Sequence, residues 1–429
     1  MWQHKRALLL PIFFLMCFAA AGQTAKTPFS AFGIGEYYGT GLAHNQGMGV
    51  GLSNPQSYYT NNMNPALLVF NKVTSFSAGI LGERRTLRDS ARSEKNISGN
   101  INYLVLAMPI KYSKWVPTRW SMALGLQPYS EVNYRFSYTS PIINSTNTVD
   151  VEEVGSGGIN QAFWSNAVSL TEDLSIGVKA AYLFSAITTQ TVNQLTNTNQ
   201  TVVYNPLVYQ RINVRDFNFT LGLSYHRDSV GRRNHRINAG LIYDFTRDIN
   251  AIYYQRLERS VAGTTVDSTV LVTSESGSIR LPQTIGAGFS VSNFNNRWTV
   301  GVDAIFQDYR KFSGFGGDTP ATQNAWRFAL GAEFTPDPTS LSTYLKRITY
   351  RTGVSLNEYP YLINGAPVRD FGINFGFSLP VNRGFSSLDF AAKVGQRGSI
   401  GKNRIEESYF KLYFGMTFND QWFIKRRFD

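Results

Sequence analysis

Four histidines and one serine in a glycine-rich stretch are the residues of this sequence best suited to bond-breaking chemistry. The histidines are His4, His44, His226 and His235, and none has a second ligand at the spacing of a metal site. Ser156 lies within residues 155–158, but a serine hydrolase needs a Gly-x-Ser-x-Gly turn before a helix and a converging histidine. We therefore predict no metal site, no cofactor and no enzyme.

A second set of polar residues consists of single charges within segments that otherwise alternate apolar and small side chains. They are Lys179, Asp244, Asp303, Arg327, Glu333, Arg351, Asp389 and Lys393. Facing lipid near the bilayer midplane, each lysine or arginine would cost roughly 2–4 kcal/mol. We expect these charges to face an interior, where they pair with one another or tie down an enclosed segment. A specific ligand-binding role for one of them is the alternative.

The composition indicates which kind of secondary structure carries these charges. Of the 429 residues 43% are hydrophobic, 14% aromatic and only 16% charged, whereas about 25% are charged in an average soluble protein. After the N-terminus no apolar run approaches the roughly 18 residues of a membrane-spanning helix. An aromatic-rich chain without such runs favours alternating strands. Fourteen segments alternate with a period of two: 72–84, 99–112, 119–138, 159–170, 174–190, 208–226, 235–254, 280–293, 297–309, 324–335, 347–357, 368–380, 386–396 and 406–419.

The last segment shows the pattern most clearly. Phe410, Leu412, Phe414, Met416 and Phe418 share one face, and Tyr409, Lys411, Tyr413, Gly415 and Thr417 share the other. Strands of this length suit a bilayer, with apolar residues to lipid and small or polar residues to a lumen. Because lipid does not tolerate open sheet edges, they must close. The sequence predicts an all-β, transmembrane antiparallel β-barrel of about fourteen strands over residues 72–429.

The connections support this topology. Those after even segments are mostly short, and we expect those after odd segments, at residues 139–158, 191–207 and 255–279, to form long outer loops. Val266 to Ser274 could be a further strand or an extension of a hairpin.

The N-terminus predicts two more parts. Residues 1–23 run from basic through apolar to small residues, as in a cleaved signal peptide, with an anchor helix or a lipid-modified Cys17 as alternatives. Cys17 is the single cysteine, so no disulfide is expected after cleavage. Residues 24–71 hold many glycines and asparagines and alternate little. Glycine permits tight turns and close packing, so we predict an N-terminal plug, or hatch, inside the barrel; a loose periplasmic tail is the alternative.

Short motifs in this region resemble the FadL-type outer-membrane transporters. They are Phe-Ser-Ala-Phe-Gly-Ile-Gly from Phe29, Gly-Met-Gly-Val-Gly from Gly47, and Asn64, Pro65 and Ala66 before the first strand. Residues 281–288, which begin Leu-Pro, similarly look like a late barrel strand of that family. The resemblance implies a plugged fourteen-stranded barrel in which Asn64, Pro65 and Ala66 form part of a gate.

The same resemblance implies a lateral opening at a kinked third strand. Pro128 interrupts the third segment, and proline marks a bulge or break because it cannot donate to the ladder. Pro128 and Tyr129 are therefore the candidates for the opening, with an ordinary bulge as the alternative. An external apolar groove like that of the family is not found, since residues 255–279 are mostly polar.

The net charge of +12 falls to +10 without Lys5 and Arg6. Basic residues are spread out, which argues against nucleic acid and favours outer-membrane lipid and lipopolysaccharide phosphates, with Arg84, Arg85, Arg88 and Arg92 as the best group. We predict a cell outer-membrane channel for passive uptake of hydrophobic small molecules such as long-chain fatty acids. The alternatives are a non-catalytic barrel subunit of a secretion or surface-anchoring complex, with protein partners at its outer loops, and an outer-membrane hydrolase.

Overall fold

A computed structural model describes residues 26–39, 41–56, 58–110, 119–142, 148–195, 205–232, 234–261, 264–295, 297–317, 322–381 and 386–420. The predicted signal peptide, residues 1–23, and Cys17 lie outside these ranges. Within the described residues, no helix is long and apolar enough to cross a membrane.

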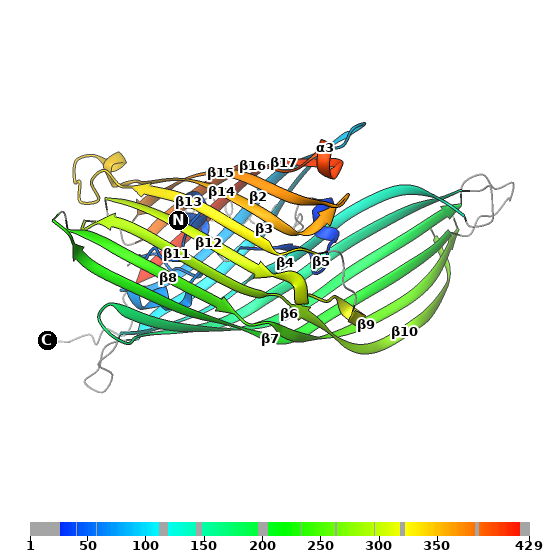
Figure 1. Cartoon of the computed structure of the whole chain (residues 1–429), viewed down its shortest axis with the longest axis horizontal. Helices are drawn as coiled ribbons and strands as arrows, with labels where there is room; N and C mark the ends of the chain where they lie inside the picture. The colour runs from blue at the N-terminus through cyan, green and yellow to red at the C-terminus, as the bar shows by residue number, and fades with distance from the viewer. Residues whose placement is uncertain are drawn as a thin grey trace, which may run out of the picture.

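The described chain forms one antiparallel sheet that closes on itself (Figure 1). Its strands are β2 (Thr74–Arg88), β3 (Ser93–Ile110), β4 (Trp120–Pro141), β5 (Thr148–Ser169), β6 (Leu174–Leu195), β7 (Asn205–Val230), β8 (His235–Asp244), β9 (Arg247–Val261), β10 (Thr264–Leu281), β11 (Gln283–Asn293), β12 (Trp298–Asp308), β13 (Ala325–Phe334), β14 (Thr349–Ile363), β15 (Ala366–Val381), β16 (Ser386–Ser399) and β17 (Ile405–Asp420). β17 pairs with β2 from Asp420↔Thr74 to Glu406↔Arg88, which seals the cylinder.

Two barrel strands are each broken into two pieces. β8 and β9 both pair with β7, so together they form one strand interrupted at Phe245 and Thr246. β10 pairs with β9 and β11 pairs with β8, so they form the next strand, interrupted at Pro282. In the described part the barrel therefore has fourteen strands, and each overlaps one of the fourteen predicted segments.

The alternation places apolar side chains outside. Phe375 is 54% exposed on the outer surface, whereas its neighbour Asn374 is 2% exposed on the inside. Leu412 and Tyr413 are arranged in the same way on β17. Because an outward apolar band suits lipid and an inward polar face suits a filled lumen, this is a transmembrane barrel.

The walls differ in height. We call the end at which β2 begins the inner end and the opposite end the outer end. β4 to β7 are 22 to 26 residues long, whereas β12 and β13 have 11 and 10. Figure 1 shows the long strands, with β9 and β10, reaching beyond the others at one end. We call β4 to β7, β9 and β10 the tall wall.

The prediction of long outer loops is wrong for residues 139–158 and 255–279, because most of both ranges belongs to the tall wall and the connection between β9 and β10 spans only residues 262–263. Residues 191–195 and 205–207 also belong to the tall wall, and residues 196–204 lie outside the described ranges. The physical reason is that these extensions rise past the apolar band. Water then faces both surfaces, and the apolar row that marks a strand in the sequence disappears. Val266 to Ser274 is a hairpin extension within β10.

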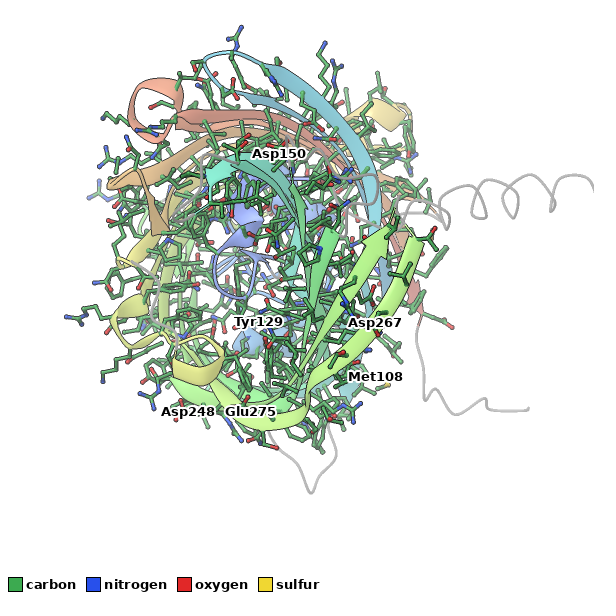
Figure 2. All side chains as sticks on the ribbon, turned by 90° about the vertical axis from the view of Figure 1, so that its right-hand side faces the viewer. Met108, Tyr129, Asp150, Asp248, Asp267 and Glu275 are labelled. Atoms are coloured by element: carbon green, nitrogen blue, oxygen red, sulfur yellow. The ribbon has the colours of Figure 1, made fainter. Side chains whose placement is uncertain are left out.

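Residues 26–71, which we call the plug, lie inside the ring of strands (Figure 2, blue). The plug contains the short helices η1 (Pro28–Ala31), α2 (Ala43–Met48) and η2 (Pro65–Phe70) and the two-residue strand β1 (Glu36–Tyr37). α2 packs against β13 to β17, and η2 packs against β4 to β7. Outside the plug, η3 (Tyr309–Lys311), η4 (Phe315–Gly317) and α3 (Ile400–Asn403) lie at the outer end, and η5 (Tyr344–Arg347) lies at the inner end.

Candidate functional site

The plug is anchored to the wall at Asn64, Pro65 and Ala66. Asn64 is 0% exposed and caps η2, because its Oδ1 accepts a hydrogen bond from the Ala66 N–H at 3.0 Å. Pro65 fits the first helical position, which needs no N–H donor. The Asn64 amide donates to the Leu52 carbonyl at 3.0 Å and to the Leu223 carbonyl of β7 at 3.1 Å. One side chain thus joins two parts of the plug to the barrel.

Three glycines of the wall allow this close contact. A methyl group at Gly240 of β8 would lie 1.9 Å from the Leu52 carbonyl oxygen, and one at Gly177 of β6 would lie 2.4 Å from the Ala66 nitrogen. At Gly222 of β7 it would lie 2.3 Å from the Asn64 side chain. A side chain at any of these positions would push the plug away from the wall.

Two of the predicted lumen charges bind the plug backbone directly. The Asp303 carboxylate accepts hydrogen bonds from the N–H groups of Gly51 and Leu52 at 2.7 and 3.1 Å. The Arg327 guanidinium donates to the Gly49 carbonyl at 2.8 Å. Hydrogen bonds to a charged partner are stronger than neutral ones, so these two residues hold the middle of the plug.

Glu333 and Arg351 form a pair beneath the plug. Their Nε–Oε2 distance is 3.1 Å, and Glu333 also accepts hydrogen bonds from Gln56 at 3.1 and 3.3 Å. The Arg351 guanidinium lies over the ring of Tyr59, 5.5 Å from its centre. Close by, His44 of α2 lies 5.0 Å from the same ring, and burial first, then Arg351, lowers the His44 pKa well below its ordinary value.

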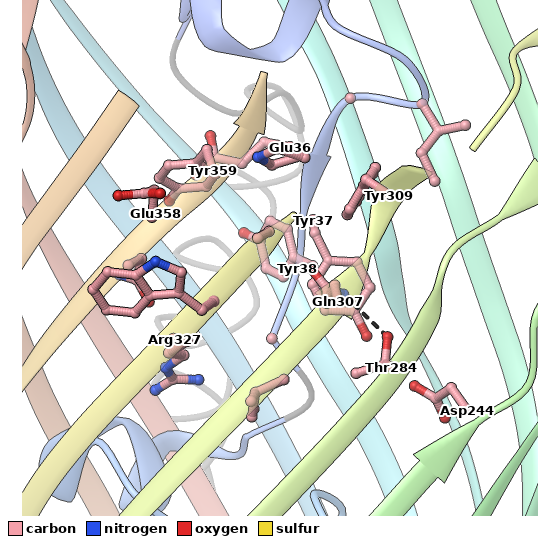
Figure 3. Close-up of a pocket in the computed structure, with 18 of the residues that line it drawn as sticks. Glu36, Tyr37, Tyr38, Asp244, Thr284, Gln307, Tyr309, Arg327, Glu358 and Tyr359 are labelled. Carbon is pink, nitrogen blue, oxygen red and sulfur yellow. Dashed lines mark hydrogen bonds between the residues drawn. The ribbon is translucent and has the colours of Figure 1, made fainter. Parts of the chain in front are cut away.

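Asp244, another of the predicted lumen charges, lies elsewhere. It lines a cavity of about 230 Å³ on the outer side of the plug, together with Lys179, Arg327 and aromatic residues. Figure 3 shows Tyr37 and Tyr38 of the plug in the middle of this cavity, between Arg327 on one side and Asp244 on the other.

One side of the cavity continues into an apolar surface on the tall wall. Buried residues of this surface come from six strands: Val132, Tyr134, Ile159, Leu183, Ile187, Val214, Ile249, Ala251, Ile279 and Leu281. Ile34 of the plug and Phe312, which follows β12, pack against it and also line the cavity. The cavity and this surface meet at Ile34 and Phe312, and the cavity itself is lined by apolar side chains such as Ile242 and Ile305 together with charged and phenolic groups.

The opposite side is closed by a cluster of eight buried or partly buried charges, of which only Lys393 was predicted from the sequence as a lumen charge. Its members, which we call the ion cluster, are Glu36, Glu83, Arg85, Asp370, Lys393, Arg397, Glu407 and Lys411. Glu36 of β1 is central, at 2.9 Å from Arg85, 2.6 Å from Arg397 and 3.7 Å from Lys411. Burial would raise the Glu36 pKa, but Arg397 and Arg85 outweigh burial and hold it well below its ordinary value.

The position of Arg85 corrects one sequence-based assignment. Arg85 is 2% exposed and faces inward from β2, so it is not in a lipid-contacting group with Arg84, Arg88 and Arg92. β2 continues to Arg88, and its odd-numbered residues face inward, from Ser75 and Ser77 to Glu83 and Arg85. Following that parity beyond residue 84 would have found Arg85, one of the three cations of the cluster that contact Glu36.

The wall changes at Pro128. The register between β4 and β5 shifts between Pro128 and Ser130, which bulges Tyr129. On its other side β4 pairs with β3 only from Leu104↔Leu126 to Ile110↔Trp120. Beyond that point, β1 of the plug pairs with this edge of β4 in place of β3. Tyr37 lies opposite Ser130, and the Tyr38 N–H donates to the Tyr129 carbonyl at 2.8 Å.

The fold and the site define a transmembrane β-barrel whose lumen is filled by its own N-terminal segment. Comparison with known families then identifies the particular group: the BamG family model matches residues 4–429, and the chain belongs to the BamG family. The similarity to FadL-type transporters is one of fold, because the family that matches has a different name. No curated protein sequence matches the chain.

Solved structures share the architecture. The "CymD monoaromatic hydrocarbon channel" has a TM-score of 0.57 and 14% identity, over 90% of this chain and 99% of that one. The toluene transporter TodX of Pseudomonas putida has a TM-score of 0.56 and 14% identity, over 89% and 99%. A FadL homologue of Pseudomonas aeruginosa has a TM-score of 0.51 and 12% identity, over 90% and 98%. At these identities the likeness shows the fold alone.

Proposed function

We propose that this protein is an outer-membrane channel for passive uptake of hydrophobic small molecules such as long-chain fatty acids. The observation that carries the proposal is the cavity of about 230 Å³ on the outer side of the plug, whose lining includes the apolar side chains of Ile34, Ile242 and Phe312. Burial of a methylene group contributes about 0.8 kcal/mol, so an acyl or aryl group is held there without covalent chemistry. The names of the hydrocarbon channels that share the fold point in the same direction.

The lateral exit in this proposal is the place where β3 and β4 separate, beside Pro128 and Tyr129. β1 is only two residues long, and it occupies the edge of β4 that β3 leaves free. Tyr37 and Tyr38, which follow Glu36, line the cavity on their other side. Release of β1 would thus join the cavity to the lipid phase, while Asn64, Pro65 and Ala66 form the anchored part of the gate.

The experiment is uptake of radiolabelled oleate by cells with and without the protein, with mass spectrometry of lipid bound to the purified barrel. Thr220→Trp fills the cavity from β7, and we expect it to abolish most of the uptake. Thr352→Trp is the matched control, because Thr352 is exposed on the outer face of β14. Equal uptake by cells lacking the protein, with no lipid in the purified barrel, would overturn the proposal.

Membrane placement in this proposal follows from the outward charges of the β2–β3 hairpin. Arg84 and Arg88 lie on the outer face of β2, beyond the apolar residues Phe76 and Ile80. At that height they meet the phosphates of outer-membrane lipid or lipopolysaccharide. Cell fractionation tests the placement, since an aqueous protein without detergent would contradict it.

A barrel subunit of a secretion or surface-anchoring complex is the second candidate. The chain belongs to the BamG family, which does not share the name of the hydrocarbon channels, and this leaves room for a function other than hydrocarbon transport. The outer part of β10 is mostly polar and extends far beyond the apolar band, as a docking surface would. Purification in mild detergent separates the two functions, because a channel purifies alone and a subunit purifies with stoichiometric partners.

A further inference from the structure

Two oppositely charged residues of the cavity lining, Lys179 and Asp244, have no direct partner in the described part of the chain. Lys179 is 6% exposed, and its side chain makes neither a hydrogen bond nor an ion pair of 4 Å or less with a described residue. The Oδ1 atom of Asp244 is buried and accepts no hydrogen bond from these residues. Buried charges of this kind are unfavourable unless something pairs with them.

The other charged side chains of the lining are all bound. Glu36, Lys393, Arg397 and Lys411 belong to the ion cluster. Glu358 pairs with Arg369 at 2.8 Å, and Arg327 donates to the Gly49 carbonyl at 2.8 Å. Lys179 and Asp244 are therefore the lining charges that a molecule in the cavity can bind without breaking an existing contact.

Lys179 and Asp244 lie at one level of the wall, on either side of Thr220. Thr220 of β7 is opposite Lys179 of β6 and also opposite Asp244 of β8. Residues opposite one another on neighbouring strands have Cβ atoms about 4.5–5.5 Å apart, so the Cβ atoms of Lys179 and Asp244 are roughly 9–11 Å apart. The two charges attract each other across this distance without touching.

The gap between the two charges has the length of an α-amino acid group. A charge-assisted hydrogen bond spans about 2.7–2.9 Å. One such bond from Lys179 to a carboxylate and another from an ammonium to Asp244 leave a length that two groups on one carbon atom can fill. A fatty acid has the carboxylate alone, so it would neutralise Lys179 and leave Asp244 unpaired.

The rest of the lining suits an apolar body attached to such a head. Beyond Asp244 the polar row continues with Thr284 of β11 and Gln307 of β12, and the Gln307 amide donates to the Thr284 hydroxyl at 3.2 Å (Figure 3). Ile242 and Ile305 lie two residues before Asp244 and Gln307 on the same strands and also line the cavity. An apolar side chain can therefore lie beside the charged head.

We propose that the cavity binds an α-amino acid with an apolar side chain. Its carboxylate lies at Lys179, its ammonium lies at Asp244, and its side chain packs on Ile242 and Ile305. This inference rests on the channel proposal for the way into the cavity, and it adds a zwitterionic class of solute to that proposal.

The test is isothermal titration calorimetry of the full chain, purified in detergent, with three ligands that share a phenyl ring. They are L-phenylalanine, 3-phenylpropionate, which lacks the ammonium, and phenethylamine, which lacks the carboxylate. We expect L-phenylalanine to bind at least tenfold more tightly than either of the others, because it alone carries both charges. Equal affinity of the three ligands, or no binding of L-phenylalanine at millimolar concentration, would overturn the inference.

Single substitutions should exchange the preferred ligand. Asp244→Asn should weaken L-phenylalanine binding at least tenfold and make 3-phenylpropionate the preferred ligand, whereas Lys179→Met should make phenethylamine the preferred ligand. Asp150→Asn, at an exposed position of β5, is the charge-matched control and should keep the native order. A misfolded barrel would lose all three ligands, so an exchange of preference identifies the two charges. An unchanged preference for L-phenylalanine in both variants would contradict the proposed contacts.

Thr220→Trp locates the binding, because it fills the cavity between the two charges and should abolish L-phenylalanine binding. Binding that survives in T220W would place the amino acid elsewhere and overturn the inference. Oleate uptake is measured on cells, so the two proposals fail separately. Uptake without L-phenylalanine binding contradicts this inference alone, and L-phenylalanine binding without uptake contradicts the channel proposal alone.

Discussion

Glu36 connects the plug to the barrel through charge, as the plug's member of the ion cluster. The cluster contains four acids, Glu36, Glu83, Asp370 and Glu407, and four bases, Arg85, Lys393, Arg397 and Lys411. Buried charges are tolerated when they are balanced, and removal of one partner leaves an uncompensated charge in a poorly solvated place.

The first prediction concerns this residue. Glu36→Gln should weaken plug docking by about 3–5 kcal/mol, the usual effect of breaking a buried ion pair, because Arg85 and Arg397 lose their shared carboxylate. Amide exchange of α2 and β1 should then accelerate by more than a hundredfold, while the barrel strands stay protected. Glu94→Gln, at an exposed position of β3, is the control. Unchanged exchange of the plug in E36Q would refute the central place given to Glu36.

The second prediction is a pH dependence set by His44. Its depressed pKa means that the docked plug binds fewer protons than the undocked one. Docking is therefore fully favoured above about pH 6.5, the ordinary histidine value, and weakens as the pH falls below it, by up to about 1.4 kcal/mol per unit. Glu36 stays ionised throughout this range because its pKa is lowered well below 4.5.

Single-channel conductance from pH 8 to pH 5 measures this effect. Open events should become more frequent below pH 6.5 in the native protein. His44→Phe keeps a ring against Tyr59 but cannot be protonated, so its open frequency should not change with pH. A pH response that persists in H44F would assign the titration to another group.

Among elements, the glycine positions of β6, β7 and β8 decide how closely the plug approaches the wall. Gly240→Ala places a methyl group 1.9 Å from the Leu52 carbonyl. The β8 backbone is held by its two ladders, and Leu52 is held by its hydrogen bonds with Asn64 and Asp303. Overpacking of this kind costs about 1–3 kcal/mol, so the third prediction is a lower melting temperature with loss of plug protection. Gly82→Ala on β2 has nothing within 4 Å and should melt like the native barrel. Identical melting of the two variants would show that the contact yields easily.

The elements also show how far the sequence can be interpreted. All fourteen barrel strands overlap a predicted segment, because lipid on one side and a polar lumen on the other impose a strict period of two. Where lipid ends, that constraint ends, and the extensions of β9 and β10 were predicted as a loop. β1 has only two residues, which is too short for a recognisable sequence pattern. Its pairing with β4 depends on the edge that β3 leaves free.

At the candidate site the limits are similar. Asp303, Arg327, Glu333 and Arg351 contact the plug or one another in the structure, on the face that a single charge in an alternating segment is expected to occupy. Which of them bind the plug depends on contacts between residues about 250 or more apart, such as Asp303 with Gly51. No local pattern carries that information.

At the scale of the molecule, the barrel ladder closes without the plug, because β17 pairs directly with β2. The fourth prediction is that a chain lacking residues 26–66 still forms a barrel and conducts ions, with a melting temperature below that of the full chain. The deletion removes Glu36 and leaves three acids facing four bases in the ion cluster. Lys411, which lies 3.7 Å from both Glu36 and Glu83, then becomes the excess charge.

Lys411→Met restores three acids to three bases, so it should raise the melting temperature of the deleted chain. In the full chain the same substitution should lower it, because Glu36 loses one of its cations. If Lys411→Met changes the melting temperature in opposite directions in the two chains, charge balance is the cause. A loss of packing at Lys411 would lower both melting temperatures. Circular dichroism melts of the four proteins measure the sign, and a decrease in both backgrounds would mean that packing, not charge, couples the plug to the wall.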